Sequence, residues 1–331
     1  MRRSAMLMVT LVVALAWPAT ASTASASPIS SDAPDDGFDE YMALGDSYTA
    51  GPLMPVMTTG PLGGARSCAN YPAYLAEYLD VTSYVDASCA GAQTRHITEK
   101  QATFWGTNPA QLDAVGDDTD LVTLGIGGND FDLFAELTTR CPALRSHDPS
   151  GAPCRQRFTV DGTDTKMRDA RRIEQRVTGV LRAVRDRTQH ATIVVIGYPR
   201  ILPQRGVCPE VLPFADGDYR WADRVERRLN TSLKRAARSA GARFVEMYPP
   251  SRGHTGCAGD RAWVNGRQIE PMRATAYHPF EDGMRAVAAA AYSELTGHTA
   301  PVPGVPDTQA PALTRQQQRE LMSKLAVGGA G

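Results

Sequence analysis

The sequence lacks the patterns that mark several common classes of protein. None of its six cysteines forms a C-x-x-C pair, so a zinc site is disfavoured, and nothing demands a metal or other cofactor. There is no basic tract, and a formal net charge of −1 gives no argument for nucleic acid as a partner. No internal repeat is visible. The 331 residues suffice for one large domain with a sizeable core.

The amino terminus has the pattern of a secretory signal rather than of a membrane span. Arg2 and Arg3 form a positive region, Met6–Trp17 is a short apolar region, and Ala24–Ala26 offers an A-x-A cleavage site. Ala19–Ala21 offers a second site, and an uncleaved anchor helix is the alternative. Cleavage after Ala26 removes two positive charges and no negative ones, so the net charge moves from −1 to −3. We predict a secreted, mildly acidic protein.

The rest of the chain divides by composition. A segment rich in Ser, Pro and Asp follows the signal. The tail has prolines at 301, 303 and 306 near its start and ends in Gly-Gly-Ala-Gly. Within the tail, the polar stretch Thr314–Lys324 favours a short helix. The predicted organisation is a signal peptide over residues 1–26, a flexible lead-in over 27–38, one α/β domain over 39–299 and a carboxy-terminal extension over 300–331.

Apolar runs and helical spacing alternate along the middle of the chain. Five runs predict strands, namely Tyr41–Leu44, Val81–Ala87, Asp120–Ile126, Ala191–Gly197 and Arg243–Met247. Helices are predicted at Tyr71–Leu79, through Ile173 and Val184, at Ala215–Ala240 and at Met284–Leu295. This alternation predicts an α/β fold with a doubly wound, mainly parallel sheet and helices on both faces.

The tetrad Gly45–Tyr48 follows the first predicted strand and predicts a sharp turn that displays Ser47. A serine held at a strand end can act as a nucleophile if a base reaches it. Ser47 follows the first predicted strand, Gly91 the second and Asn129 the third. Because ligand sites lie at the carboxyl ends of parallel strands, we expect all three at one edge of the sheet. The turn is not a G-x-S-x-G elbow, since Thr49 replaces its last glycine.

Four blocks, taken in order, resemble the SGNH or GDSL-type hydrolase family. They are Gly45-Asp46-Ser47, then Gly91, then Gly127-Gly128-Asn129-Asp130, and finally His278-Pro279 with Gly283. The resemblance covers most of the chain and implies a flavodoxin-like three-layer fold and a secreted carboxylic-ester hydrolase, similar to actinobacterial lipases and esterases. A nucleotide-binding loop is the competing interpretation, but G-x-G-x-x-G needs a glycine where Asp130 stands.

The resemblance implies a role for each block. Ser47 is the expected nucleophile and His278 the expected general base. The backbone N–H of Ser47, the residue Gly91 and the side-chain amide of Asn129 are the expected oxyanion hole.

The chain departs from the family at the expected acid. An aspartate commonly precedes the histidine by three residues, and that position here is Thr275. We therefore predict a dyad in which a backbone carbonyl of Thr275 or Ala276 accepts the Nδ1 proton of His278. Glu281 and Asp282 are the rival partners, although both follow the histidine in a turn that should face solvent.

Six cysteines fit an exported protein, and they allow about fifteen connectivities among which the sequence alone cannot choose. Related secreted lipases imply sequential pairing, which also keeps each loop local. The expected bridges are Cys68–Cys89, Cys141–Cys154 and Cys208–Cys257. The segment Arg140–Lys166, which does not fit the alternation of strands and helices, is then a disulfide-stapled insertion beside the site.

Three apolar segments either wall the substrate site or pack the core: Leu53–Met57, Phe104–Trp105 and Phe131–Phe134. They favour fatty-acyl esters, hence a lipase or esterase. A phospholipase of the A type, a carbohydrate acetyl esterase and a non-catalytic secreted binding protein remain as alternatives. We expect a monomer whose partner is a lipid or other ester substrate, with transient contact to a lipid interface.

Overall fold

The computed structural model describes residues 37–302, 314, 316–317 and 319–320. The predicted signal peptide, most of the lead-in and much of the carboxy-terminal extension lie outside these residues. Of the helix predicted in that extension, positions 316, 317, 319 and 320 are helical, and most of its other positions lie outside the described residues. No helix in the described part of the chain is both long and apolar enough to cross a bilayer.

Five strands form the central sheet in the order β2-β1-β5-β8-β9, and each neighbouring pair is parallel. This order is the flavodoxin-like one, so the predicted fold class is confirmed. The strands lie within or close to the predicted apolar runs. They are β1 (Glu40–Gly45), β2 (Ser83–Asp86), β5 (Leu121–Gly125), β8 (Thr192–Ile196) and β9 (Arg243–Val245).

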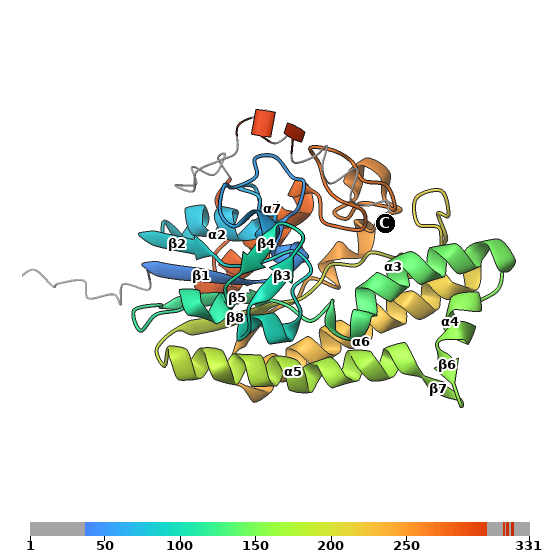
Figure 1. Cartoon of the computed structure of the whole chain (residues 1–331), viewed down its shortest axis with the longest axis horizontal. Helices are drawn as coiled ribbons and strands as arrows, with labels where there is room; N and C mark the ends of the chain where they lie inside the picture. Colours follow the sequence, from blue (N-terminus) through green and yellow to red (C-terminus); the bar gives the residue numbers. More distant parts are fainter. Residues whose placement is uncertain (1–36, 303–313, 315, 318, 321–331) are drawn as a thin grey trace, which may run out of the picture. The chain divides into compact units, whose positions relative to one another are not determined.

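Helices cover both faces of the sheet (Figure 1). On one face lie α2 (Tyr71–Leu79) and α7 (Glu281–Thr296), which pack against each other and the sheet. On the other face lie the long helices α5 (Thr165–Arg187) and α6 (Asp216–Ser239). Because both faces are covered, every residue of β5 is buried, which explains its nearly continuous apolar sequence.

The segment 140–166 is built around the expected disulfide and contains regular structure. The helix α3 (Leu133–Leu144) runs into it, α4 (Pro153–Arg157) follows, and Cys141–Cys154 joins the two. A hairpin of β6 (Thr159–Val160) and β7 (Thr163–Asp164) completes it. A second hairpin, β3 (Gln101–Thr103) and β4 (Gly106–Asn108), was not predicted. Short 3₁₀ helices are η1 (Leu62–Gly64), η2 (Thr94–Ile97), η3 (Gln111–Ala114), η4 (Asp130–Asp132), η5 (Arg145–His147), η6 (Pro250–Gly253) and η7 (Gly259–Arg261).

Two of the three expected disulfides are present, and the third expectation is wrong. Cys208–Cys257 is formed, as is the bridge between α3 and α4, but Cys68 and Cys89 are free and buried. The sulfur of Cys89 instead lies 3.3 Å from the carbonyl oxygen of Gly63 and 3.3 Å from Nδ2 of Asn108. Burial raises the pKa of the Cys89 thiol to about 11, so it stays protonated. Proximity along the chain does not by itself bring two Cβ atoms into bonding geometry.

Candidate active site

Ser47 opens a four-residue helix, α1 (Ser47–Ala50), directly after β1. The residue before it, Asp46, caps this helix, because its Oδ1 accepts the backbone N–H of Tyr48 at 2.9 Å. The turn is too tight for a side chain at Gly45, where a Cβ would lie 2.1 Å from Oγ1 of Thr49 and 2.6 Å from the carbonyl oxygen of Gly125. The serine is therefore held at the carboxyl edge of the sheet.

His278 lies against this serine. Its Nε2 is 2.7 Å from Oγ of Ser47, and its Nδ1 is 2.6 Å from the carbonyl oxygen of Ala276. A carbonyl can only accept, so Nδ1 carries the proton and Nε2 is left to accept the serine O–H. The structure thus joins the two residues that we expected to form the dyad.

Of the other groups that we weighed as partners of His278, two are engaged elsewhere and one is exposed. The carbonyl oxygen of Thr275 accepts Nδ2 of Asn265 at 3.2 Å. The carboxylate of Glu281 has other partners. Its Oε1 accepts hydrogen bonds from the hydroxyl of Tyr74 at 2.5 Å and from the guanidinium of Arg285 at 2.7 Å. Asp282 is exposed. Of the two carbonyls considered from the sequence, the structure places that of Ala276 on the imidazole.

Burial lowers the pKa of His278 to about 4, although its hydrogen bond to Ala276 acts in the opposite direction. The imidazole is therefore neutral near neutral pH and can accept a proton. Its ring also packs on Tyr48, with ring centroids 5.2 Å apart. The hydroxyl of Tyr48 reaches back to the carbonyl oxygen of Tyr277 at 2.5 Å. Tyr48 was not singled out from the sequence, although it belongs to the tetrad that contains Ser47.

Gly91 and Asn129 line the same cavity as Ser47 and His278. One hydrogen of the Asn129 amide is donated to the carbonyl oxygen of Ala92 at 3.0 Å, which leaves the second for a ligand. Gly91 has φ +72°, a conformation that favours glycine, and its position is exposed. Within residues 37–302 the backbone N–H groups of Ser47 and Gly91 have no intramolecular acceptor.

Asp130 supports the loop that carries Asn129. Its buried carboxylate accepts the backbone N–H and the hydroxyl of Thr94, at 3.1 and 2.7 Å, and pairs with Arg176 at 2.6 Å. Two residues with positive φ, Phe131 and Asp132, follow at once. Asp130 thus braces a tightly turned loop and does not point at the serine.

The cavity around the serine has a volume of about 410 Å³, within the range of small-molecule sites. Of the expected apolar wall, Leu53, Trp105 and Phe134 line it. The other residues of those segments do not line the cavity. Phe104, for example, is 84% exposed, and the ring of Phe131 packs against the guanidinium groups of Arg176 and Arg172, which lie 3.8 and 4.1 Å from its centroid. Lining residues that sequence reasoning missed are Pro52, Gly63, Ala65, Ala90, Ala135, Thr138, Ile201, Ile269 and Tyr277.

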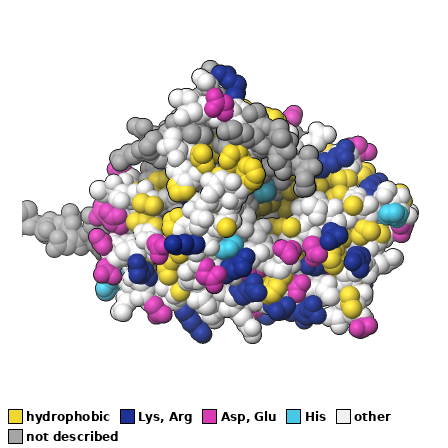
Figure 2. All heavy atoms as spheres, in the orientation of Figure 1, with side chains coloured by type: hydrophobic (Ala, Val, Ile, Leu, Met, Phe, Trp, Pro, Cys, Tyr) yellow, Lys and Arg dark blue, Asp and Glu magenta, His cyan; other side chains and the backbone are white. Residues whose placement is uncertain are grey.

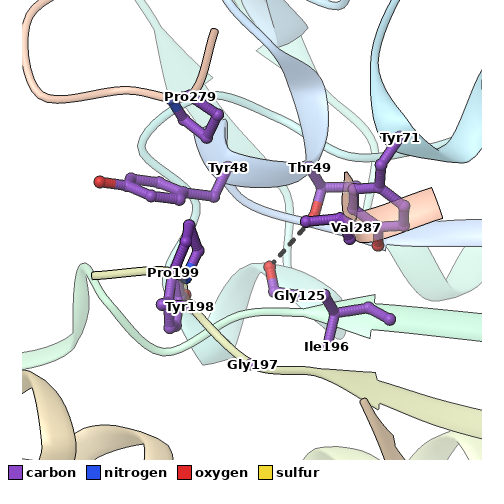
Figure 3. A pocket seen from close by; sticks show the side chains of 10 residues that line it. All are labelled: Tyr48, Thr49, Tyr71, Gly125, Ile196, Gly197, Tyr198, Pro199, Pro279 and Val287. Carbon is purple, nitrogen blue, oxygen red and sulfur yellow. Dashed lines mark hydrogen bonds between the residues drawn. The ribbon is translucent and has the colours of Figure 1, made fainter. Parts of the chain in front are cut away.

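A space-filling view and a close-up show two further features of the molecule. Figure 2 shows hydrophobic side chains gathered on the upper middle of one face, beside a hollow, with charged side chains mixed over the lower part. Figure 3 shows a second, much smaller cavity of about 10 Å³ behind the nucleophile turn. There Tyr48 and Tyr198 lie on one side, and Thr49, Tyr71 and Val287 on the other. Among the described residues, no cluster of His, Cys, Asp and Glu is arranged to hold a metal ion.

Residues 43–286 match the model of the GDSL-like lipase/acylhydrolase family, which is well over half of the chain. The chain belongs to this family. Lipase 2 of Streptomyces coelicolor is 34% identical over 296 residues, which covers 87% of this chain and 95% of that protein. The resemblance drawn from the four sequence blocks is thereby confirmed, and this member of the GDSL-like family is a carboxylic-ester hydrolase.

Solved structures agree with the fold of this GDSL-like family member. The extracellular lipase of Streptomyces rimosus matches with a TM-score of 0.63 and 25% identity, over 79% of this chain and 100% of that one. The phospholipase A1 of Streptomyces albidoflavus matches with a TM-score of 0.63 and 24% identity, over 78% and 100%. At that identity the second likeness speaks for the fold alone.

Proposed function

We propose that this protein is an exported lipase or esterase that hydrolyses fatty-acyl esters through an acyl-enzyme on Ser47. The observation that carries the proposal is the contact of 2.7 Å between Oγ of Ser47 and Nε2 of His278 at the wall of an apolar cavity. A serine hydroxyl is a weak nucleophile until a neighbouring base removes its proton, and this contact provides the base.

In the acylation step, Nε2 of His278 takes the proton of Ser47 as Oγ attacks the ester carbonyl carbon. The carbonyl oxygen becomes an oxyanion, which in this proposal accepts hydrogen bonds from the backbone N–H groups of Ser47 and Gly91 and from the side-chain amide of Asn129. Donors preorganised in this way are worth about 3–4 kcal/mol each. The C–O bond of the ester then breaks, and the imidazolium returns its proton to the leaving alcohol.

In the deacylation step, water takes the place of the alcohol. Nε2 of His278 removes a proton from the water as its oxygen attacks the acyl-serine carbonyl, and the same donors hold the second oxyanion. Collapse breaks the bond to Oγ of Ser47, and the proton on the imidazolium goes to that oxygen. The fatty acid leaves and the resting dyad is restored, with water as the second substrate.

The lining of the cavity supports an acyl chain as the group that it binds. Its side walls are largely aliphatic and aromatic, and among the described lining residues His278 is the only one with a titratable side chain other than tyrosine. A small polar sugar ester would leave this apolar surface exposed to water, which is unfavourable by roughly 25 cal/mol per Å². Fatty-acyl esters are therefore favoured over acetylated carbohydrates. Among the lining residues that the structure describes there is also no lysine or arginine to bind a phosphate.

Export and lipid contact belong to the same proposal. Two disulfides are formed in the described chain, as expected for an oxidising compartment, and the similar Streptomyces rimosus structure is that of an extracellular lipase. Large apolar side chains are exposed near the cavity, including Phe104 at 84%, Ile269 at 52% and Leu62 at 41%. We propose that they touch the lipid interface transiently. One chain supplies the whole site, so a monomer suffices.

A chain-length profile tests the proposal. Initial rates are measured on p-nitrophenyl esters from acetyl to palmitoyl, and on triacylglycerol and phosphatidylcholine, with Ser47→Ala as the blank. We expect a maximum at medium or long chains and turnover of triacylglycerol. Activity confined to acetyl esters would favour the carbohydrate esterase, a clear preference for phosphatidylcholine would favour a phospholipase, and no turnover at all would contradict the proposed activity.

A further inference from the structure

Tyr198 stands at the carboxyl end of the fourth strand of the sheet, two residues after β8. This is the same sheet edge from which Ser47 follows β1 and Asn129 follows β5. The residue is 3% exposed, and its side chain reaches under the nucleophile turn rather than into the substrate cavity. Figure 3 shows it beside Tyr48 at the small cavity behind that turn.

The hydroxyl of Tyr198 makes two hydrogen bonds, one to each of the loops that carry the reacting groups. It donates to Oδ2 of Asp46 at 2.5 Å, and it accepts the backbone N–H of Gly128 at 2.9 Å. Asp46 directly precedes Ser47, and Gly128 directly precedes Asn129. One atom therefore ties together the neighbours of the proposed nucleophile and of the proposed oxyanion-hole amide.

Further links between the two segments lie closer to the sheet, and the hydroxyl of Thr49 makes one of them with the carbonyl oxygen of Gly125 at 3.3 Å. The backbone N–H of Asp46 donates to the carbonyl oxygen of Gly125 at 2.9 Å, which continues the pairing of β1 and β5. Beyond that point the second loop runs on through Gly127, with φ +119°, to Gly128. A Cβ at Gly128 would lie 2.3 Å from the ring of Phe134, so the loop is packed too closely for any other residue there.

Packing fixes the ring that carries this hydroxyl. The ring of Tyr198 meets those of Tyr48 and Phe134 edge to face, with centroids 5.2 Å apart in both pairs. Burial raises the pKa of Tyr198 well above its ordinary value, which keeps the hydroxyl protonated and able to donate. Asp46 uses its other oxygen to cap α1, so both of its carboxylate oxygens are engaged.

We propose that Tyr198 is a positioning residue, which sets the distance between Ser47 and Asn129 by holding Asp46 and Gly128 on one hydroxyl. The inference rests on the proposed roles of Ser47 and Asn129. The oxyanion hole works only if its donors lie about 3 Å from where the charge develops. A misplacement of about 1 Å can cost on the order of a hundredfold in rate. Binding of the substrate in the apolar cavity does not depend on the distance between Ser47 and Asn129. Loss of this positioning should therefore lower kcat and leave KM nearly unchanged.

The test is a double-mutant cycle on a soluble medium-chain p-nitrophenyl ester. Tyr198→Phe keeps the ring and removes both hydrogen bonds, and we expect kcat to fall roughly 10- to 100-fold with KM within about twofold. In an Asn129→Ala background the same change should cost less than about threefold, because the amide that it positions is already gone. A purely structural role would instead lower kcat equally in both backgrounds.

Tyr41→Phe is the matched control, because this fully buried hydroxyl bonds Oγ1 of Thr123 at 2.7 Å and touches neither loop. It should lose stability as Tyr198→Phe does and keep its kcat. Two results would contradict the positioning role of Tyr198 and leave the proposed activity standing. They are equal losses of kcat with and without Asn129, and an unchanged kcat in Tyr198→Phe. A wild-type protein that hydrolyses no ester would overturn the proposed activity, and this role with it.

Discussion

The carbonyl oxygen of Ala276 lies 2.6 Å from Nδ1 of His278, only two residues away in the same turn. A main-chain dipole thus occupies the place where many serine hydrolases present a carboxylate. It fixes the tautomer and the plane of the ring as a carboxylate would. It brings no full negative charge, however, and so it offsets only part of the desolvation that lowers the pKa of His278 to about 4.

If the carbonyl orients the imidazole, the acidic residues that follow His278 are dispensable. We expect Glu281→Gln and Asp282→Asn to keep kcat within about threefold, whereas His278→Ala should lower it by about 10⁴-fold or more. Steady-state kinetics on one p-nitrophenyl ester measure all three. A loss beyond a hundredfold in either carboxylate variant, in a protein that still melts cooperatively, would contradict the dyad.

The low pKa of His278 predicts an acid-tolerant enzyme. Only the neutral imidazole can act as the base, so kcat/KM should hold as the pH falls through 6.5 and decline about tenfold per unit below about 4. An acid limb centred near 6.5, the value of an unperturbed histidine, would contradict this. Burial raises the pKa of Asp46 to about 7, so this carboxyl group also titrates near the serine. Asp46→Asn removes that titration and is the control, and it should leave the position of the acid limb of kcat/KM unchanged.

The same shift predicts how stability depends on pH. The unfolded chain protonates His278 near 6.5 and the folded chain only near 4, so the unfolded state binds more protons between these values. The contribution of this group to stability is therefore fully present above about 6.5 and is lost as the pH falls through about 4. Thermal unfolding across this range should show a smaller loss in His278→Ala than in the wild type.

The acyl pocket should respond to a bulky residue on α3. Ala135 is exposed and lines the cavity, so Ala135→Phe fills space in it without disturbing the core. We expect the optimum of the p-nitrophenyl series to move to shorter chains, with kcat/KM for the longest ester reduced about tenfold or more. Thr139→Phe, on the same helix but outside the cavity lining, should leave the profile unchanged. If both variants have the same chain-length profile, Ala135 does not line the site that binds the acyl chain.

The thiol content tests the correction to the disulfide pattern. With Cys68 and Cys89 free, titration with a thiol reagent in denaturant should find two thiols per chain before reduction and six after it. If no thiol is found before reduction, Cys68 and Cys89 form the third disulfide after all, and the correction is wrong. The bridge Cys208–Cys257 closes a separation of 49 residues, so its removal should cost about 4 kcal/mol in the chain-entropy model.

Much of this architecture could be predicted from the sequence, because apolar runs such as Asp120–Ile126 are typical of a strand covered on both faces. Strand ends then placed Ser47, Gly91 and Asn129 at one edge. Applied to the fourth run, Ala191–Gly197, the same rule would have singled out Tyr198, which follows it directly.

What the sequence could not decide depended on distances across the fold. Thr275 and Ala276 are adjacent, and only the folded backbone shows that the carbonyl of Ala276 meets Nδ1 of His278, whereas that of Thr275 accepts Nδ2 of Asn265 and the backbone N–H of His278. The expected Cys68–Cys89 bridge failed for a similar reason, since a separation along the chain says nothing of where each sulfur points. Both outcomes depend on the local direction of the backbone and side chains, which spacing along the sequence does not give.

Covalent labelling tests the central claim most directly. The protein is treated with a fluorophosphonate ester, which phosphonylates an activated serine, and the modified peptide is identified by mass spectrometry. Our account predicts one adduct, on Ser47, with labelling slowed at least a hundredfold in His278→Ala and absent in Ser47→Ala. An adduct on another residue, or an active enzyme that the reagent neither labels nor inhibits, would contradict it.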